Sequence, residues 1–424
     1  MISELKIRNF KSLESVDLKL GHFNLLVGAN ASGKSNFLDA LRFLQGMSQR
    51  GLSIDEILDG KPPSSARVRW PGIRGGSRFA AFRNPDATEA TGIEFHVTLA
   101  GPMFTEHIGG DITYNLRLSL ANDNPVFLEE SFVHGSDRFV LVDRRGDPEQ
   151  GSSGPIEAKT LDFSKMGALP IIAGVSKRTW SDVRASKPNP DEAQLRLYDL
   201  LFFGADLTSA EFADMQFLDP LPAVLRGYSS KVVRLGEDGE GLAALIHEIS
   251  ANGSKDALLN WLKELRPDEV DDIYALEGLN NDFMVAIKEG NKEFRGPVLS
   301  EGTLRFIALA AAFFQPSMPR VLIIEEIEKG LHPSRLRLLL ELMRSQSKRS
   351  GTQVFATTHS PTLLNWLTEE DRKTTFVCTR DAASGATKMR SLAEVPRLEE
   401  LIKKNYNLDQ LFEEGWLESV LHES

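Results

Sequence analysis

The segment "LLVGANASGKSNFLDAL", residues 25–41, decides the fold of this chain. Its glycine-rich part has the spacing G-x-x-x-x-G-K-S, formed by Gly28, Gly33, Lys34 and Ser35. A short apolar run (23–27) precedes it and is typical of a buried strand, and apolar residues at helical spacing follow it. A tight turn over a helix N-terminus aims backbone N–H groups at one point, where an anion binds. The segment therefore predicts a loop that binds the phosphates of a nucleoside triphosphate.

Each residue type in this loop suits phosphate chemistry. The glycines permit the tight turn, the Lys34 ammonium can reach the β- and γ-phosphates, and the Ser35 hydroxyl can ligate Mg²⁺. The candidate nucleotide-binding residues are Gly28, Ala29, Asn30, Ala31, Ser32, Gly33, Lys34, Ser35 and Asn36.

A second segment, "VLIIEEIEKGLHP" (321–333), supplies carboxylates. Its four apolar residues predict a buried strand, which places Glu325 and Glu326 at the carboxyl edge of a sheet, where open α/β sheets bind ligands. A triphosphatase needs such carboxylates to hold the metal and to activate water. Taken alone, the acids also fit an ordinary helix start, which favours Asp and Glu.

Two further segments complete the candidate site. "VFATTHS" (354–360) reads as another buried strand, and His359 at its end could contact the γ-phosphate or be a structural histidine. "LSEGTLRFIAL" (299–309) places Ser300 and Gly302 at the start of an apolar helix, which suits an anion but also an ordinary helix N-cap. His332, in "GLHP", is a weaker candidate that could simply shape a loop.

Composition restricts the class of protein. The 424 residues carry a formal net charge of −11, which argues against a basic coat for nucleic acid. The single cysteine, Cys378, excludes a disulfide framework or a Cys-based zinc site within one chain. No apolar run approaches the roughly 20 residues of a membrane span. The N-terminus has charges where a signal peptide needs an apolar core, so we expect a cytoplasmic protein.

The pattern along the chain predicts an α/β head with an antiparallel β subdomain and a helical insert. Period-two alternation near the N-terminus and in four segments between residues 93 and 142 predicts an antiparallel meander. Residues 282–294 read as a β-hairpin, and helices alternate with buried strands from 299 to 360. We expect this division: an N-terminal part of the head (1–164), a helical insert (165–228), a C-terminal part of the head (229–394) and a helical tail (395–424).

The four motifs in this order resemble the ABC-type ATPase heads of the RecF/SMC superfamily. The likeness is closest to stand-alone AAA-family ATPases related to the overcoming-lysogenisation-defect (OLD) nucleases. Residues 1–45 look like that family's opening strands and Walker A motif. "LSEGTLR" resembles its signature, "VLIIEEIEKGLHP" its Walker B and D-loop segment, and "ATTHS" its H-switch. The likeness is loose over 46–229.

The resemblance implies a mechanism that uses ATP and Mg²⁺. Two heads would sandwich ATP head-to-tail, so that Ser300 and Gly302 contact the γ-phosphate held by Lys34 of the partner subunit. Glu326 would be the general base and His359 the γ-phosphate sensor. Glu325 stands where most of the superfamily has an Asp for magnesium, so the division of roles between the two acids is open. No residue is assigned to the family's Q-loop glutamine.

The resemblance leaves the biological role open. No sustained heptads and no Cys-x-x-Cys are present, and residues 361–424 are too few for the toprim nuclease domain of OLD proteins. We therefore expect a regulatory ATPase of a prokaryotic anti-phage system. It would form a homodimer or a higher homo-oligomer and control a separately encoded effector, which we expect to be a nuclease. The alternatives are a RecF-like repair ATPase acting directly on DNA and an ATP-gated scaffold with negligible turnover. An ABC-transporter subunit is more distant, since no membrane-coupling surface is identifiable.

One loop bears on nucleic acid. Residues 61–83 contain no carboxylate and six cations, with aromatic side chains between them: Lys61, Arg67, Arg69, Arg74, Arg78 and Arg83, with Trp70, Phe79 and Phe82. These could follow a phosphate backbone and stack on bases. They fit equally a solvated loop whose cations pair with acids. The insert (165–228) is the candidate partner-facing segment, although its apolar run at 200–203 also suits a core.

Overall fold

The computed structural model describes residues 1–49, 52–60, 70–82, 92–121, 124–135, 137–143, 192–230, 232, 234–265 and 270–422. The chain forms two compact units, each assembled from separate stretches. Unit 1 contains Met1–Gly21, Ala29–Asp214 and Cys378–Arg390, and unit 2 contains His22–Gly28, Met215–Val377 and Ser391–Ser424. The boundaries that the sequence suggests at 164, 228 and 394 stay predictions.

Unit 1 is built on an antiparallel sheet with the strand order β2-β1-β4-β5-β6-β7. Its strands are β1 (Ile2–Phe10), β2 (Leu13–Lys19), β4 (Ile93–Leu99), β5 (Ile112–Ala121), β6 (Asn124–His134) and β7 (Asp137–Asp143). β4, β5, β6 and β7 pair consecutively, which confirms the predicted meander, and β1 pairs with β4 at one end of that series. Its helices are α1 (Lys34–Met47), α2 (Ile54–Asp59), α3 (Pro102–Ile108) and α6 (Glu192–Ala213), with a short 3-10 turn at Ser77–Phe79.

Aromatic side chains anchor α1 to the inner face of this sheet. The rings of Phe10 in β1, Phe43 in α1 and Phe95 in β4 pack with centroids 5.2–5.9 Å apart. All three are fully buried. The alternation in β4, where Ile93, Phe95, Val97 and Leu99 are buried, turns every second side chain toward this core. The helix that follows the glycine loop is therefore rigidly seated.

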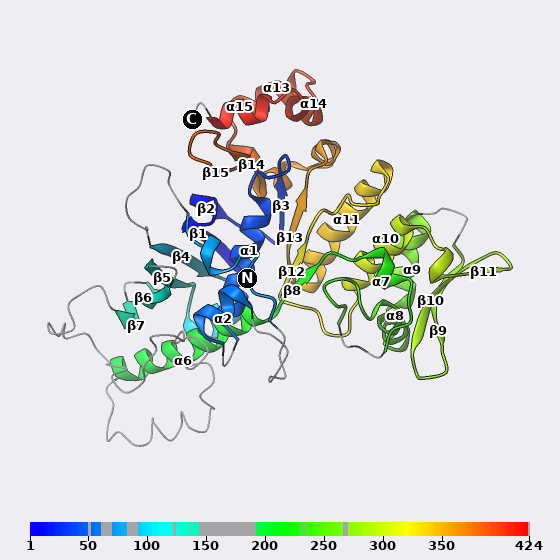
Figure 1. Ribbon diagram of the computed structural model, residues 1–424, viewed down its shortest axis with the longest axis horizontal. Coiled ribbons are helices and arrows are strands. Elements are labelled where there is room, and N and C mark those ends of the chain that lie inside the picture. Colours follow the sequence, from blue (N-terminus) through cyan, green and yellow to red (C-terminus); the bar gives the residue numbers. More distant parts are fainter. Residues whose placement is uncertain are drawn as a thin grey trace. The chain divides into compact units, whose positions relative to one another are not determined.

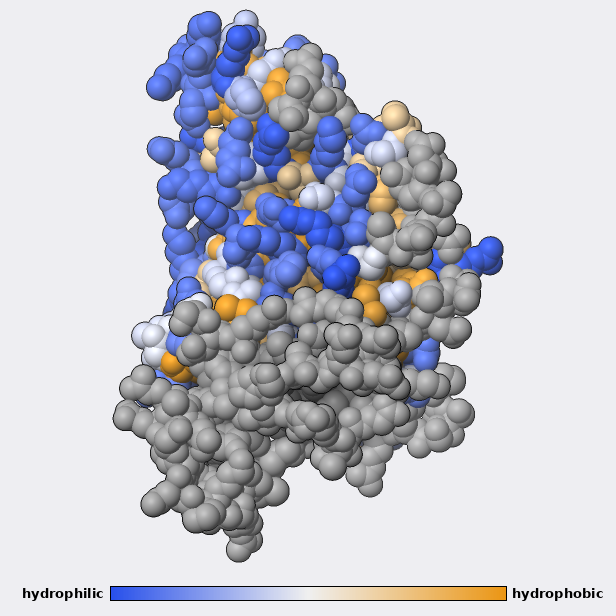
Figure 2. All heavy atoms as spheres, turned by 90° about the vertical axis from the view of Figure 1, so that its left-hand side faces the viewer, coloured by the Kyte–Doolittle hydropathy of each residue, from blue (hydrophilic) through white to orange (hydrophobic). Residues whose placement is uncertain are grey.

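The outer face of the sheet is polar. Figure 2 shows the side of the molecule on which β1, β2 and β4 lie in Figure 1, and hydrophilic residues predominate among those coloured there. This agrees with the half-buried polar positions of β1 and β4.

Unit 2 contains the parallel part of the fold. β14 (Thr375–Arg380), β3 (Phe23–Val27), β13 (Gln353–Thr358), β12 (Val321–Ile324) and β8 (Met215–Leu218) lie side by side in that order (Figure 1). All four pairings are parallel. β14 continues into unit 1, where β15 (Thr387–Ser391) pairs with it and completes the sheet. β3, β12 and β13 are buried along their whole length, as their continuous apolar runs predict.

Helices and a small antiparallel sheet, β11-β10-β9, make up the rest of unit 2. The strands are β9 (Asp272–Glu277), β10 (Phe283–Glu289) and β11 (Lys292–Arg295), and the last two confirm the predicted hairpin. The helices are α7 (Pro222–Leu225), α8 (Leu242–Ala251), α9 (Lys255–Leu265), α10 (Glu301–Ala312), α11 (Pro333–Ser350), α12 (Glu369–Lys373), α13 (Leu398–Lys403), α14 (Leu408–Glu413) and α15 (Trp416–His422). Within the described part of the chain, no helix has both the length and the apolar character needed to cross a membrane.

The structure describes part of the segment expected to be a helical insert, and much of that described part is helical. Residues 165–191 lie outside the described residues, and α6 forms the helical part, packing against α1 and α3 within unit 1. Phe203, from the apolar run at 200–203, lies against the ring of His107, whereas the side chains of 200–202 are not described. β8 is a strand that the sequence pattern did not indicate within this segment. Its four residues, "MQFL", are too few for a periodic signal, and parallel pairing with β12 makes them a strand.

Candidate functional site

The glycine loop connects β3 to α1 through two residues with left-handed backbone. Gly33 has φ 102° and Ala31 has φ 64°. The position of Gly33 is also tightly enclosed, because a Cβ there would lie 1.9 Å from Thr387 Oγ1. Only glycine satisfies both conditions without strain. The second glycine of the motif is therefore required by conformation and by space.

The loop fits an anion. α1 is 14 residues long, and none of the side chains that the structure describes caps its N-terminus. Ser32 is buried, and its Oγ has no hydrogen-bond partner among the described residues. The Lys34 ammonium is also largely buried and donates to the Ala29 carbonyl at 2.8 Å, so the charge lies over the loop. An uncapped helix start, an unpaired buried hydroxyl and an enclosed cation together suit a bound phosphate.

Charged residues next to the loop support α1. Asp39 is buried and forms ion pairs with Lys11 and with Arg74, whose Nε lies 3.0 Å from Asp39 Oδ1. Arg74 also donates to the Ser35 carbonyl at 2.8 Å. Within the basic loop (61–83), Lys61, Arg67, Arg69 and Arg83 lie outside the described residues. Pairing with an acid is therefore the role of Arg74 in this structure, and nucleic-acid binding by the loop stays a prediction.

The predicted acids follow β12 directly. Glu325 and Glu326 are both half-buried, and Glu326 has a left-handed backbone with φ 49°. The Glu326 N–H donates to Thr357 Oγ1 at 2.9 Å, and the Glu325 N–H donates to the Leu218 carbonyl at 3.1 Å. A non-glycine residue in this region is strained unless its surroundings hold it. The turn at Glu326 is thus a position that tertiary contacts maintain.

The parallel sheet brings Gly28, the predicted acids and His359 to one edge of unit 2. Val27 pairs with Thr358, and Ile324 pairs with both Ala356 and Leu218. Because parallel strands end on the same side, the carboxyl ends of β3, β13, β12 and β8 share one edge of unit 2. The residues that follow these ends are Gly28, His359, Glu325 and Asp219. Residues 29–36, including Lys34 and Ser35, belong to unit 1.

Arg305 is a functional candidate that the sequence reasoning missed. It lies in α10 and is 1% exposed. One guanidinium nitrogen donates to Asp219 Oδ1 at 2.9 Å and to the Pro220 carbonyl at 2.7 Å. The other donates to the carbonyls of Glu325 and Glu326 at 3.0 and 3.1 Å. The signal that could have found it is a lone arginine in the apolar helix "GTLRFIALAAAFF", since buried charges are rare unless paired.

His359 is held by Glu328. Its Nδ1 and its backbone N–H both lie 2.6 Å from Glu328 Oε1. With Nδ1 donating to this carboxylate, Nε2 remains for another partner. The side chain of His359 is 46% exposed, so its ring is accessible. Glu328, which follows the predicted pair of acids, is thus a positioning group for the histidine.

Ser300 is the N-cap of α10. Its Oγ accepts from the Thr303 N–H at 3.2 Å, which agrees with the interpretation as an ordinary cap. Gly302 allows a close approach, because a Cβ there would lie 2.3 Å from the Gly330 carbonyl oxygen. Ser300, Thr303 and Arg335 line an open hollow of about 310 Å³ in unit 2. The signature segment therefore faces accessible space.

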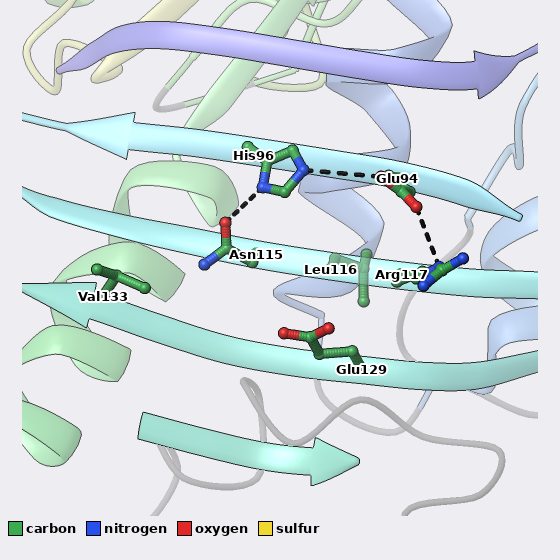
Figure 3. A pocket seen from close by; sticks show the side chains of 7 residues that line it. All are labelled: Glu94, His96, Asn115, Leu116, Arg117, Glu129 and Val133. Atoms are coloured by element: carbon green, nitrogen blue, oxygen red, sulfur yellow. Dashed lines mark hydrogen bonds and ion pairs between the residues drawn. The ribbon is translucent and has the colours of Figure 1, made fainter. Parts of the chain in front are cut away.

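A second hollow, of about 410 Å³, lies on the outer face of the unit 1 sheet (Figure 3). Its lining charges Glu94, Arg117 and Glu129 alternate in sign across paired strands, and Arg8 on the neighbouring strand pairs in register with Glu94. Arg117 Nε lies 3.0 Å from Glu94 Oε1, and His96 Nδ1 lies 2.6 Å from Asn115 Oδ1, as the dashed lines in Figure 3 show. Cross-strand pairing of this kind is typical of a solvated sheet face.

Known proteins share both the sequence pattern and the fold. A family model described as "AAA domain, putative AbiEii toxin, Type IV TA system" matches residues 116–365, and one described as "AAA ATPase domain" matches residues 1–84. An "ATP/GTP phosphatase" of Helicobacter pylori is 23% identical over 383 residues, which cover 89% of this chain and 90% of that protein. The DNA replication and repair protein RecF of Glaesserella parasuis is 50% identical over 44 residues, which cover 10% of this chain and 12% of RecF.

The fold likeness extends over nearly the whole chain. The SMC head crystallised with the C-terminal winged-helix domain of ScpA has a TM-score of 0.51 at 14% identity, covering 95% of this chain and 99% of that one. This confirms the predicted P-loop ATPase head. The chain belongs to the family described as AAA domain, putative AbiEii toxin, type IV toxin–antitoxin system, and is an ABC-type ATPase of the RecF/SMC superfamily.

Proposed function

We propose that this chain binds ATP with Mg²⁺ on the loop of residues 28–36 and hydrolyses the γ-phosphate. The observation that carries the proposal is the loop itself. Its left-handed Gly33 is enclosed, its Lys34 ammonium bonds the Ala29 carbonyl, and among the described residues the buried Ser32 hydroxyl has no partner and no side chain caps α1. The name of the Helicobacter pylori relative, "ATP/GTP phosphatase", supports hydrolysis rather than binding alone.

The acids at the sheet edge have separate roles in this proposal. Ser35 and Glu325 would hold Mg²⁺, which when bound would supply neutralisation of charge on the phosphates. Glu326 accepts a proton from the attacking water. The hydrogen bond from its N–H to Thr357 and the contact of its carbonyl with Arg305 support this role, because they keep the Glu326 backbone in a single conformation. His359, oriented by Glu328, presents Nε2 to the γ-phosphate.

Two copies of the chain assemble head-to-tail in this proposal, as a homodimer or within a higher homo-oligomer. Ser300 and Gly302 of one copy would then contact the γ-phosphate bound by the other. The location of Ser300 at the start of α10, on an open hollow, supports this assignment. The helix N-terminus itself favours an anion.

The ATPase regulates a separately encoded effector, a nuclease in our proposal, in prokaryotic anti-phage defence. The family description names a toxin–antitoxin system, and this supports a role in defence against phage. A RecF-like repair ATPase and an ATP-gated scaffold are the alternatives, and the cytoplasmic location stays a prediction. These readings differ in what should stimulate turnover: DNA for the repair ATPase, a partner for the regulator, and nothing for the scaffold.

The first test is ATP turnover by the pure protein, with and without linear duplex DNA, together with Glu326→Gln. We expect slow turnover that is indifferent to DNA. We expect Glu326→Gln to lower kcat by about 10²–10⁴-fold with little change in ATP affinity, because only the general base is lost. The variant should accumulate as an ATP-bound dimer, which light scattering after gel filtration measures.

Glu341→Gln is the matched control, since Glu341 is an exposed acid of α11 that pairs with Arg337. It should hydrolyse ATP at the wild-type rate. Wild-type turnover by Glu326→Gln would assign the base to another carboxylate. A several-fold rise of wild-type turnover with DNA would favour the RecF-like alternative, and ATP binding without any turnover would favour the scaffold.

A further inference from the structure

The hairpin of β14 and β15 contacts the phosphate loop through one side chain. Thr387, at the start of β15, is 2% exposed and donates from Oγ1 to the Ser32 carbonyl at 3.1 Å. Its backbone N–H donates to the Ser12 carbonyl at 2.6 Å. All three residues belong to unit 1. A residue far along the chain from the loop thus lies directly against it.

Thr387 also fills the space beside Gly33. A Cβ at Gly33 would lie 1.9 Å from Thr387 Oγ1 and 2.7 Å from Thr387 Cγ2. The Thr387 side chain therefore occupies the space that a side chain at position 33 would need. Close packing of this kind removes other conformations from the loop, because interiors do not tolerate overlap.

Two hydroxyl groups, of Ser12 and Thr387, connect the residues on either side of 33–35 by hydrogen bonds. Ser12 Oγ lies 2.6 Å from Thr387 Oγ1, and Asn36 Nδ2 donates to Ser12 Oγ at 2.6 Å. A hydroxyl has one proton to donate, and Thr387 uses its proton on the Ser32 carbonyl. Ser12 must therefore donate to Thr387. The bonds run in one direction, from the Asn36 amide through Ser12 and Thr387 to the Ser32 carbonyl, and they bracket residues 33–35.

We propose that Thr387 is a positioning residue for ATP binding. Through its hydroxyl and its methyl group it holds the loop in the conformation that accepts phosphate, so the β14–β15 hairpin is part of the nucleotide site without touching the nucleotide. The inference rests on the proposed function, ATP binding by the loop. It adds a specific requirement for a hydroxyl at position 387, with a smaller contribution from the methyl group.

The test is the affinity of the full-length protein for Mg·ATP, measured by calorimetry, with kcat and KM from turnover. Thr387→Val keeps the shape and removes the hydroxyl. It should raise Kd and KM about tenfold, the effect of losing two buried hydrogen bonds, while kcat at saturating ATP stays within about twofold. Thr387→Ser keeps the hydroxyl and should restore affinity to within about threefold of wild type.

Thr379→Val is the matched control. Thr379 lies in β14 of the same hairpin and is buried, but its Oγ1 has no partner among the described residues. The same substitution there should leave ATP affinity unchanged. Ser12→Ala removes the middle of the chain of hydroxyls and should raise Kd about fivefold. Combined with Thr387→Val it should add little, because the two act on one network.

The outcomes separate this inference from the proposed function. Wild type that binds ATP, with folded Thr387→Val binding equally well, overturns the role of Thr387 alone. If Thr387→Val does not fold, unchanged affinity in Ser12→Ala overturns it instead. Equal losses of ATP affinity in Thr379→Val and Thr387→Val would show that either substitution weakens binding by loosening the hairpin. That result would also overturn the specific role of Thr387. Wild type that does not bind ATP overturns the proposed function, and the inference with it.

Discussion

The phosphate loop and the acidic strand edge are stabilised by different means. A chain of neutral groups brackets the loop, because the side chains of Asn36, Ser12 and Thr387 are linked to one another and to the Ser32 carbonyl. The charged groups that contact the loop, Arg74 and Lys34, donate to its carbonyls. The first turn of α1 reads Lys-Ser-Asn-Phe and contains no acid. Charges hold the edge, where Arg305 is paired with Asp219 and bonded to the carbonyls of Glu325 and Glu326.

This difference follows from what each region must bind. An unpaired carboxylate beside the loop would repel phosphate. Residues 28–36 contain no acid, and the buried carboxylate of α1, Asp39, is paired with Lys11 and Arg74. Several carboxylates at one edge repel one another and need a nearby cation. Arg305 meets this need, and Lys329, 3.2 Å from Asp219 and 3.9 Å from Glu326, adds a second positive charge.

The largest effect is expected from a substitution of Gly33 in the phosphate loop. Gly33→Ala should lower ATP affinity by more than about 100-fold, because the left-handed backbone is strained for alanine and the new methyl overlaps Thr387. Titration with Mg·ATP measures the effect. Gly290→Ala is the control, since Gly290 also has positive φ but has open space around it. If Gly33→Ala kept normal affinity, the loop would not require this conformation.

A substitution at the acidic edge should lower turnover rather than ATP affinity. Arg305→Lys keeps the charge but cannot form the fork of four hydrogen bonds, so we expect kcat to fall about 10- to 100-fold. ATP affinity should stay within about threefold of wild type, because the loop is held by other groups. Turnover kinetics and thermal melting measure these effects. Arg337→Lys, at an exposed pair, is the control. A change in ATP affinity without a change in kcat would contradict the view that the two regions have separate roles.

The smallest effect is expected at Arg74, a charged residue that contacts the loop region. Its side chain is 51% exposed, and Asp39 retains Lys11 when Arg74 is lost. Arg74→Ala should change ATP affinity less than about threefold and lower the free energy of unfolding by about 1 kcal/mol or less, because Lys11 still pairs with the buried Asp39 and the Arg74 side chain is half exposed. ATP titration and urea unfolding at low and high salt measure both. A tenfold loss of affinity would instead make Arg74 part of the phosphate site.

Much of the candidate site could be predicted because its signals are local. The spacing of Gly33, Lys34 and Ser35, preceded by a buried strand, indicated the loop, and the apolar run before Glu325 indicated a strand end. The hidden parts were β8, Arg305 and Thr387. A four-residue strand has no period to recognise, and a threonine in a hairpin carries no sign of what lies against it.

The sequence by itself determined the buried strands, the helices that follow them and the residue types at their ends. Those features depend on neighbouring residues and on the period of apolar positions, which any stretch of chain displays. Only the tertiary structure decided that Thr387 fills the space at Gly33, that Glu328 orients His359 and that Arg305 bonds the carbonyls at the acidic edge. Each of these contacts joins residues from different elements of the fold, and such partners are chosen by packing rather than by spacing along the chain.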